Sequence, residues 1–355
     1  MWGAFVREEL RTLAGLLERE GFTLDEEQPH TSGERFLMTR EKLVLLGMRT
    51  ADGRRVVIKV SRHPAGHAEI RREKEVLDTL QRVAFASGAI LLPSEVYFST
   101  LSGYLVWVSE FIEQDEVFAA RPIEEQFFMA LDAFETQEGF HANTFENLRS
   151  ISGVFPIATA KTYLESFSKF KDTVAQTLNV VAVFARAERE LHAHVHTLER
   201  YSGYLTHTDF APANTRVQGR NMYLIDLSSV SFGNKYEGWA RFINWALLHS
   251  PELERFLLEY VRKNRGAEEY LCLRLMRLYK AGLLAGYYAE TLPKTAGDLR
   301  LLTEERIGLW RSVMEALLAD TPVPTVTLDD YRHKRNALRS PEETERQKEF
   351  NIPAV

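Results

Sequence analysis

A short β-rich island inside a mainly helical stretch of sequence restricts the fold of this chain more than any other feature. The island covers residues 204–230, and its polar residues His207, Asp209 and Asn214 follow the spacing H-x-D-x4-N. Asp226 ends an apolar Met-Tyr-Leu-Ile run twelve residues after Asn214. A Gln-Gly-Arg-Asn turn between two short strands would place Asn214 and Asp226 at the same end of a β-hairpin.

These residue types are the ones that phosphoryl transfer to an alcohol requires. A carboxylate must orient the attacking hydroxyl and accept its proton, which suits Asp209. Hard oxygen ligands must hold Mg²⁺, and Asn214 and Asp226 offer an amide oxygen and a carboxylate. Asp209 and His207 are the candidate catalytic residues, although a buried hydrogen-bonding role suits His207 better than direct chemistry. Each polar residue taken singly could instead cap a turn or loop; the set in its strand context favours the functional interpretation.

The rest of the chain divides into a small β-rich part and a large helical part. The first part is predicted to contain helices at 2–20 and 66–82 and strands at 43–49, 55–60, 96–100 and 104–112. The second part is predicted to contain helices at 122–138, 159–175, 178–200, 236–249, 251–263, 267–290 and 303–319. This order predicts an α+β fold with two lobes, a small β-rich N-lobe and a large, mainly helical C-lobe.

The predicted lobes define a domain organisation. We expect a nucleotide lobe with a leading helix at 1–109, a catalytic and acceptor lobe at 110–320, and a charged tail at 321–355. The lobes should meet near 110–114, where the predicted strand 104–112 ends. The tail contains Pro322, Pro324, Pro341 and Pro353. We therefore expect it to be loosely ordered or laid over the surface.

A lysine within a predicted strand supplies the cation that nucleotide phosphates need. Alternation in the run 56–60 puts Val57 and Lys59 on one face, so that Val57 could contact an adenine. A lysine among valines is costly to bury without a partner. Glu73 falls on the inward stripe of the next predicted helix and is our first choice, with Glu69 at the margin as the second. The alternative is that lysine and glutamate both face water, as most charged residues do; the downstream motif favours the pair.

The segment 104–112 has the pattern of a strand that leads into a hinge between the lobes. Backbone groups near Glu110 and Ile112 could hydrogen-bond the edge of an adenine. Any apolar strand would show the same pattern, so this prediction depends on the motifs around it.

The catalytic island resembles the aminoglycoside phosphotransferase and choline-kinase-like superfamily, a branch of the protein-kinase-like fold. The run from His207 to Asn214, His-Thr-Asp-Phe-Ala-Pro-Ala-Asn, is similar to that family's catalytic loop, and Leu-Ile-Asp226 is similar to its metal-binding segment. Val-Ile-Lys59 and Glu73 match less specifically. The similarity spans roughly residues 30 to 320.

The resemblance implies roles for these residues and a class of reaction. Asp209 would be the catalytic base, Asn214 and Asp226 the Mg²⁺ ligands, and Lys59 the contact to the α- and β-phosphates of ATP. Members of the family phosphorylate antibiotics, choline, sugars or amino-acid-like alcohols. The resemblance therefore implies a small-molecule alcohol as acceptor without selecting one. No Asp-Phe-Gly follows Ile225 and no Ala-Pro-Glu occurs, which disfavours a protein kinase.

Three positions differ from the family pattern. Thr208 stands where a glycine is common, the expected nucleotide-covering loop at 31–34 has one glycine, and the segment 238–241 lacks a further aspartate that many members carry. The rival interpretations are a pseudokinase-like protein that binds nucleotide or metabolite without turnover, and a metal-dependent hydrolase built on His207, Asp209 and Asp226. The hydrolase would need more histidine ligands near a strand end than the sequence offers.

Composition narrows the partners and the compartment. The formal charge of −6 disfavours a nucleic-acid or anionic-membrane partner. Cys272 is the only cysteine, which excludes an intrachain disulfide. The longest apolar runs are too short to span a bilayer, and we expect a cytoplasmic protein.

Three carboxylates could contact a cationic substrate, although exposure to solvent is the simpler expectation for each: Glu237, Asp329 and Asp330.

Overall fold

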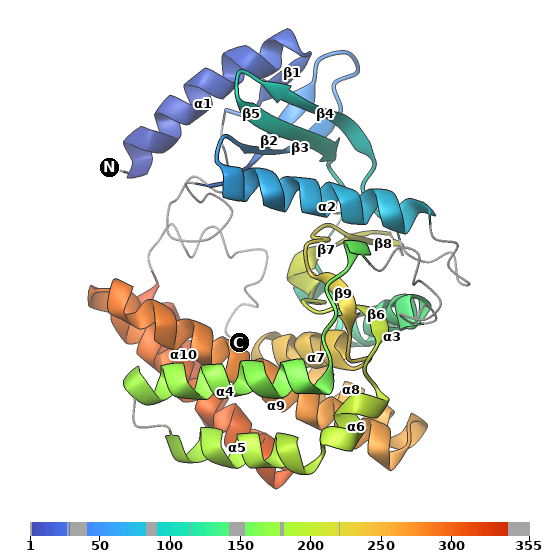
Figure 1. The fold of residues 1–355 in the computed structure, drawn as a ribbon, viewed down its shortest axis with the longest axis vertical. Helices are drawn as coiled ribbons and strands as arrows, with labels where there is room; N and C mark the ends of the chain where they lie inside the picture. The colour runs from blue at the N-terminus through green and yellow to red at the C-terminus, as the bar shows by residue number, and fades with distance from the viewer. Residues whose placement is uncertain are drawn as a thin grey trace.

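The computed structural model describes residues 2–26, 28, 41–82, 91–114, 116–141, 153–177, 181–219 and 221–339. These residues form two lobes, which lie one above the other in Figure 1. The upper lobe contains α1 (Trp2–Arg19), β1 (Phe22–Leu24), β2 (Leu43–Arg49), β3 (Arg55–Ser61), α2 (Pro64–Arg82), β4 (Glu95–Leu101) and β5 (Tyr104–Glu110). The predicted α+β arrangement of a small β-rich lobe followed by a larger helical lobe is confirmed.

The upper lobe is built on one antiparallel sheet with the strand order β1-β2-β3-β5-β4. The predicted hairpin is present, and Leu45 pairs with Ile58 across it. The sheet buries one face against α1 through Leu13 and Leu17. Because side chains alternate along a strand, Lys59 lies on the opposite face, and its cross-strand partner is Trp107 of β5. The helix α2 covers that second face.

The helix α2 joins the upper lobe to the core of the lower one. Its predicted inward stripe is confirmed, since Ile70, Leu77 and Leu80 are buried. These side chains belong to the same hydrophobic cluster as Trp107 and the interior of the lower lobe. The two faces of the sheet therefore pack separately, and the face that carries Lys59 and Trp107 is continuous with the core of the lower lobe.

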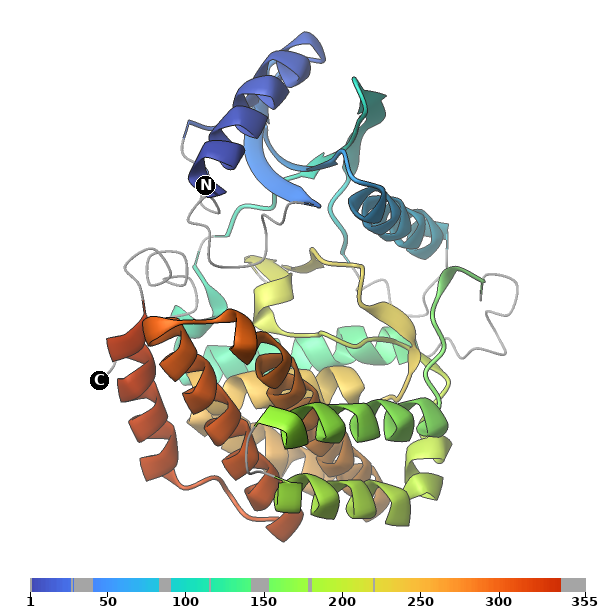
Figure 2. The same ribbon diagram turned by 60° about the vertical axis from the view of Figure 1, so that its left-hand side comes forward.

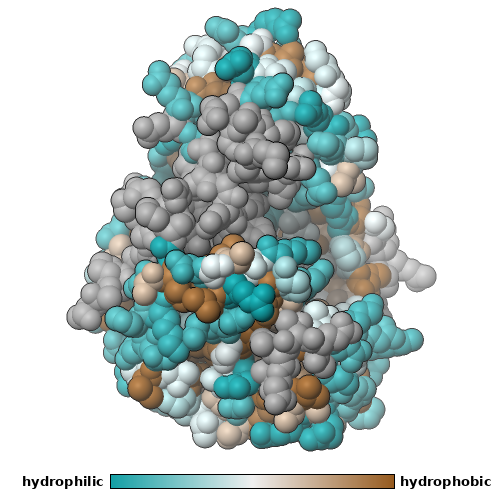
Figure 3. Space-filling model, turned by 90° about the vertical axis from the view of Figure 1, so that its left-hand side faces the viewer, coloured by the Kyte–Doolittle hydropathy of each residue, from teal (hydrophilic) through white to brown (hydrophobic). Residues whose placement is uncertain are grey.

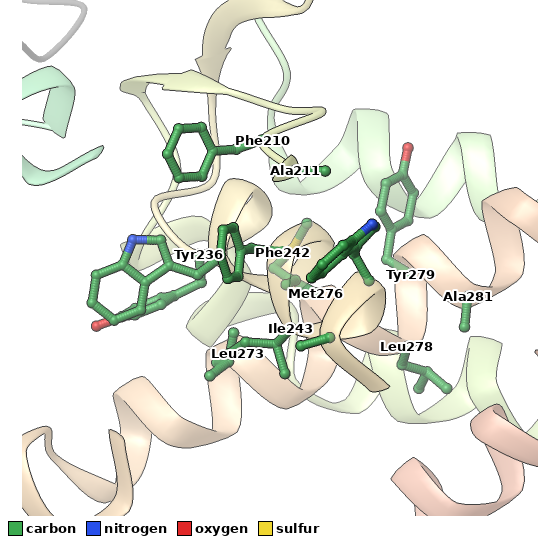
Figure 4. Packing of buried hydrophobic residues seen from close by; sticks show 14 of the residues in the cluster. Phe210, Ala211, Tyr236, Phe242, Ile243, Leu273, Met276, Leu278, Tyr279 and Ala281 are labelled. Atoms are coloured by element: carbon green, nitrogen blue, oxygen red, sulfur yellow. The ribbon is translucent and has the colours of Figure 1, made fainter. Parts of the chain in front are cut away.

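The lower lobe is mainly helical. Its helices are α3 (Ile123–His141), α4 (Ala160–Thr177), α5 (Val181–Ala193), α6 (Val195–Arg200), α7 (Glu237–His249), α8 (Pro251–Asn264), α9 (Ala267–Thr291), α10 (Gly297–Ala319) and α11 (Thr325–Leu338). The helix α9 packs against α4, α7 and α10 and lies at the centre of the lobe (Figure 2). Figure 4 shows this hydrophobic core extending from Met276 on α9 through Phe242 on α7 to Phe210.

The predicted β-rich island lies at the top of the lower lobe, below α2 (Figure 1). It consists of β6 (Tyr204–His207), β7 (Thr215–Gln218), β8 (Asn221–Leu224) and β9 (Val230–Gly233). The strands β7 and β8 form the expected hairpin, and β6 pairs with β9. A bridge from Leu91 to Tyr223 ties β8 to the segment before β4.

Four elements differ from the sequence-based expectations. The strand β1 was not predicted because it is only three residues long. The predicted helix 178–200 is divided at His194, although no helix-breaking residue marks the division. The helix α10 begins at Gly297 instead of 303. The helix α11 occupies part of the predicted tail: Pro324 lies directly before its first residue, a position that proline tolerates, so the prolines there mark a helix start.

None of the described helices is long and apolar enough to cross a membrane. Hydrophilic side chains predominate on the described surface in Figure 3. Cys272 is fully buried in α9, as its sequence context indicated.

Gly282 of α9 provides a test of the central packing of the lower lobe. A Cβ atom added there would overlap the fully buried ring of Phe167 on α4. Gly282→Ala should therefore lower the free energy of unfolding by about 1–3 kcal/mol, measured by urea denaturation. Gly308→Ala in α10 is the matched control, because nothing lies within 4 Å of its added Cβ. It should raise stability by about 0.5–1 kcal/mol. Equal effects of the two substitutions would contradict the packing described.

Candidate active site

The loop after β6 carries the H-x-D-x4-N motif between a strand and a short helical turn. The strand β6 ends at His207, and Pro212–Asn214 forms a 3-10 turn that leads into β7. The ring of Phe210 is fully buried, with its centroid 6.1 Å from that of Phe242 on α7 (Figure 4). The loop is thus held from below by an aromatic contact while its polar residues remain above.

Asp209 and Asn214 form one hydrogen-bonded unit. The Nδ2 of Asn214 donates to the main-chain oxygen of Asp209 at 2.8 Å and to its Oδ2 at 2.7 Å. Because both contacts use the amide nitrogen, the Oδ1 atom of Asn214 faces the other way. The amide oxygen is therefore available to a cation while the amide nitrogen orients the carboxylate.

Asp226 follows β8 and lies beside this unit. The main-chain N–H of Ile225 donates to the carbonyl oxygen of Asn214 at 3.1 Å, which brings the two segments together as the hairpin prediction required. The Oδ1 of Asp226 accepts hydrogen bonds from the Ser228 N–H at 3.1 Å and from the Ser228 hydroxyl at 2.7 Å. Burial has the largest effect on the pKa of Asp226 and raises it, but Lys59, Ser228 and His207 together hold that pKa below its usual value.

His207 supports the backbone of this site from within the protein. Its side chain is fully buried, and its Nε2 donates a hydrogen bond to the main-chain oxygen of Asp226. Its Nδ1 is buried without a hydrogen-bond partner among the described residues. A group with no exposed surface cannot contact an acceptor directly. The geometry therefore favours a supporting role for His207 over the direct catalytic role considered from the sequence.

Lys59 and Glu73 form an ion pair between β3 and α2. The lysine side chain is 12% exposed and the glutamate side chain 1% exposed. The Nζ of Lys59 also lies 5.1 Å from the centre of the Trp107 ring. The second choice for this partner, Glu69, pairs with Lys42 instead. The structure thus brings together Lys59 and Glu73, and the charge of Lys59 acts on Asp226 in the other lobe.

The residues predicted to contact adenine lie on β3 and at or just after the end of β5. Val57 pairs with Ser109 and is partly buried on the same face as Lys59. The N–H of Glu110 already donates to the carbonyl of Ser94 at 2.9 Å. Ile112 is buried, and no hydrogen bond of its backbone groups occurs within the described part of the chain. The backbone of Ile112 is therefore the better placed of the two for a new hydrogen bond.

Arg241 is a site residue that sequence reasoning missed. It projects from α7, and its Nε donates to the Oδ1 of Asp209 in an ion pair. Burial has the largest effect on the pKa of Asp209 and raises it, but Arg241, with smaller effects of Lys280 and His207, holds that pKa below its usual value. The only signal in the sequence is the order of polar and apolar residues along α7. That order does not identify which residue Arg241 contacts in the tertiary structure.

At Gly238, the first position of the segment that lacks the aspartate, there is no room for a side chain. A Cβ atom at Gly238 would lie 2.8 Å from the main-chain oxygen of His207 and 3.0 Å from Oε1 of Gln137. Gln137 comes from α3, is fully buried, and donates to the Thr206 hydroxyl at 3.2 Å. A side chain from a different helix thus occupies the space below the loop that follows β6. The loop is packed without the aspartate.

The three carboxylates that the sequence suggested for a cationic substrate form ion pairs within the protein. Glu237 is buried, pairs with Lys280 at 2.6 Å and accepts a hydrogen bond from the Tyr163 hydroxyl at 2.6 Å. This corrects the expectation that Glu237 faces solvent. Asp329 pairs with Arg332, and Asp330 with Lys334, on the exposed side of α11. The nucleotide-covering loop expected at 31–34 lies outside the described residues.

The residues present fit a magnesium ion bound together with phosphates. Mg²⁺ in nucleotide sites is held by one or two protein groups, with phosphate and water completing its shell. The free Oδ1 of Asn214 and the Asp226 carboxylate, whose pKa is lowered, form such a set. No group of three or more His, Cys, Asp or Glu side chains suited to a metal occurs among the described residues. The donor set therefore fits a nucleotide-bound cation better than a metal held by protein groups alone.

Comparison with known proteins confirms the fold. No family model matches the chain, and no curated protein matches it. The crystal structure of a thermostable mutant of aminoglycoside phosphotransferase APH(4)-Ia, apo form, aligns with a TM-score of 0.62 at 17% identity, over 86% of this chain and 97% of that chain. Macrolide 2'-phosphotransferase type I aligns with a TM-score of 0.56 at 15% identity, over 86% and 96%. The macrolide 2'-phosphotransferase MphH from Brachybacterium faecium gives 0.53 at 13% identity, over 88% and 98%.

These likenesses show that the chain has the two-lobed, protein-kinase-like fold. The resemblance inferred from the catalytic island is confirmed at the level of the fold. Variants of APH(4)-Ia were solved as ternary complexes with ADP or AMP-PNP and hygromycin B.

The buried pair of Glu237 and Lys280 should be important for stability. Glu237→Gln keeps an acceptor for the Tyr163 hydroxyl but leaves the Lys280 charge buried without a counterion. We expect the free energy of unfolding to fall by about 3–5 kcal/mol, measured by chemical denaturation. Adding Lys280→Met should recover most of this loss. Glu252→Gln, which breaks an exposed pair with Arg255, is the control and should change stability by less than about 1 kcal/mol. Unchanged stability in Glu237→Gln would show that the pair is not a structural support.

Proposed function

We propose that the protein is an ATP-dependent phosphotransferase that moves the γ-phosphoryl group to a hydroxyl of a small molecule. One observation carries the proposal: two loops, joined by the Ile225–Asn214 backbone hydrogen bond, present an oriented carboxylate and a magnesium-type donor set. The charge of Lys59, on the other lobe, lowers the pKa of Asp226 in this set. This is the set of groups that phosphoryl transfer requires.

Asp209 acts as the base in this proposal. Its carboxylate accepts a hydrogen bond from the acceptor hydroxyl and takes the proton as the oxygen attacks the γ-phosphorus. A bond forms between the acceptor oxygen and phosphorus, the bond from phosphorus to the β,γ-bridging oxygen breaks, and ADP leaves with that oxygen. No covalent enzyme intermediate is needed. The hydrogen bond from Asn214 fixes the direction of the carboxylate before the acceptor arrives.

Lys59 and the proposed metal ligands hold the nucleotide. Glu73 keeps Lys59 in place, because a buried lysine needs an anionic partner. From this position the ammonium group of Lys59 would contact the phosphates. Asn214 and Asp226 would hold Mg²⁺, which neutralises charge on the phosphates when bound. The adenine would lie against Val57 and hydrogen-bond the backbone near Glu110 and Ile112. The nucleotide complexes of APH(4)-Ia, a protein with the same fold, support ATP as the donor.

The lobes divide these tasks in our proposal. The N-terminal lobe to about residue 109 binds the nucleotide, and the helical lobe from residue 110 supplies the base and the acceptor site. Thr208 does not disrupt the loop, because its N–H and hydroxyl both bond the carbonyl oxygen of Ser229, at 2.9 and 3.0 Å. The loop geometry therefore favours turnover over a binding function without catalysis.

Asp209→Asn separates catalysis from binding. We expect ATP with Mg²⁺ to raise the thermal midpoint of both the wild type and the variant, because Asp209 does not contact the nucleotide in our proposal. ATP at about 100 times its dissociation constant adds about 2.7 kcal/mol to the free energy of unfolding. Slow ATP hydrolysis should fall about 100-fold or more in the variant, the usual contribution of a general base. Binding by the wild type without any hydrolysis would instead indicate a pseudokinase.

Asp226→Asn tests the proposed metal site. The extra stabilisation that Mg²⁺ adds to ATP binding should be lost, whereas stabilisation by ATP in EDTA should be retained. Asp329→Asn on exposed α11 is the control and should behave as the wild type. The proposed metal ligand is refuted if the variant keeps the full magnesium-dependent shift. Stabilisation of the wild type by metal without nucleotide would indicate a hydrolase.

A further inference from the structure

The ion pair between Arg241 and Asp209 is accessible, unlike the buried Lys280–Glu237 pair of the lower lobe. The Arg241 side chain is 22% exposed and the Asp209 side chain 41% exposed. In contrast, both members of the Lys280–Glu237 pair are below 10% exposed. A molecule that reaches the base can therefore also reach the guanidinium group.

The guanidinium group of Arg241 has unused hydrogen-bonding capacity. Its Nε donates to Oδ1 of Asp209, while its two terminal nitrogens have no hydrogen-bond partner within the described residues. A guanidinium group binds carboxylate or phosphate oxygens through two parallel hydrogen bonds. Arg241 can therefore hold Asp209 and still offer two donors to a bound anion.

The three carboxylates considered from the sequence for a cationic acceptor have partners elsewhere. Glu237 is used by Lys280 and Tyr163, and Asp329 and Asp330 are paired on α11. Within the described residues, the charged side chain in contact with the proposed base is an arginine. For a cationic group bound next to Asp209, the paired arginine charge offsets the attraction of the carboxylate.

We propose that the acceptor is a compact hydroxy acid, whose anionic group binds Arg241 while its hydroxyl binds Asp209. The inference rests on the proposed phosphotransferase function and specifies its substrate class. Because Nε of Arg241 contacts Oδ1 of Asp209 directly, the positions for the anion and the hydroxyl are adjacent. The hydroxyl and the anionic group of the acceptor are therefore only a few bonds apart. Polycationic alcohols fit this arrangement poorly.

Matched pairs of acceptors provide the test. Glycolate, glycerate and 3-hydroxybutyrate are compared with their own primary amides, and ethanolamine and choline serve as cationic alcohols. ADP release is measured with saturating ATP and Mg²⁺, and kcat/KM is determined for each acceptor. We expect the wild type to prefer at least one acid over its amide by about 10-fold or more, the usual strength of hydrogen bonds to a charged group.

Substitution of Arg241 then tests the residue itself. Arg241→Gln should reduce the acid-to-amide ratio to about twofold or less, and Arg241→Lys should retain part of it, since lysine keeps the charge but not the paired donors. Arg255→Gln on α8 is the control, because it removes an exposed arginine paired with Glu252, and it should keep the full ratio. The ratio is informative because a residue that only positions Asp209 would lower both rates equally.

Three results would overturn the inference. The first is a wild type that uses amides or cationic alcohols as well as the acids, or that shows no acid-stimulated ADP release above the rate with water. The second is an Arg241→Gln variant whose acid and amide rates fall by the same factor. The third is a variant with weakened ATP binding and an unchanged ratio, which would assign Arg241 to the nucleotide. Failure of the proposed function differs from all three, because the wild type would then show neither magnesium-dependent ATP binding nor hydrolysis.

Discussion

The site depends on a few hydrogen bonds that fasten the main chain of two loops together. The Ile225 N–H bonds the carbonyl of Asn214, His207 bonds the carbonyl of Asp226, and Thr208 bonds the carbonyl of Ser229. Each bond joins the segment after β6 to the segment after β8, so the two loops hold one another in place. These contacts use backbone oxygens, so they occupy neither the amide oxygen of Asn214 nor the carboxylate of Asp226, whose Oδ1 bonds Ser228. Preorganised groups of this kind need no rearrangement when the reaction begins.

The packing below the loop explains how this fold tolerates its unusual sequence features. Gly238 allows α7 to approach the carbonyl of His207, and Gln137 fills the adjoining space from α3. The Phe210 and Phe242 rings close the same region from the apolar side. Farther below, Lys280 and Glu237 join α9 to α7 through a buried pair. The loop is thus supported from two helices, with a glycine at the point of closest approach.

Residues whose roles follow from local spacing could be predicted from the sequence. Alternation along β3 placed Lys59 on the correct face, the stripe of α2 selected Glu73 over Glu69, and the hairpin spacing brought Asn214 beside Asp226. Arg241 could not be found this way, because it lies 32 residues after Asp209 and only tertiary packing brings them together. The burial of Glu237 was missed for the same reason: its partners Lys280 and Tyr163 come from distant helices. The helix α11 was missed because Pro324 was interpreted as a mark of a loose tail, whereas here it precedes a helix.

Asp209 connects the two ligands that the proposed reaction requires. Its Oδ2 accepts a hydrogen bond from Asn214, a proposed metal ligand, and its Oδ1 accepts one from Arg241, the proposed contact to the acceptor. The orientation of one carboxylate is therefore set from the nucleotide side and from the acceptor side at once. A hydroxyl that binds this carboxylate is placed between a fixed amide and a fixed guanidinium group. Because catalysis by proximity depends on such alignment, the acceptor's own charge should affect its rate as well as its binding.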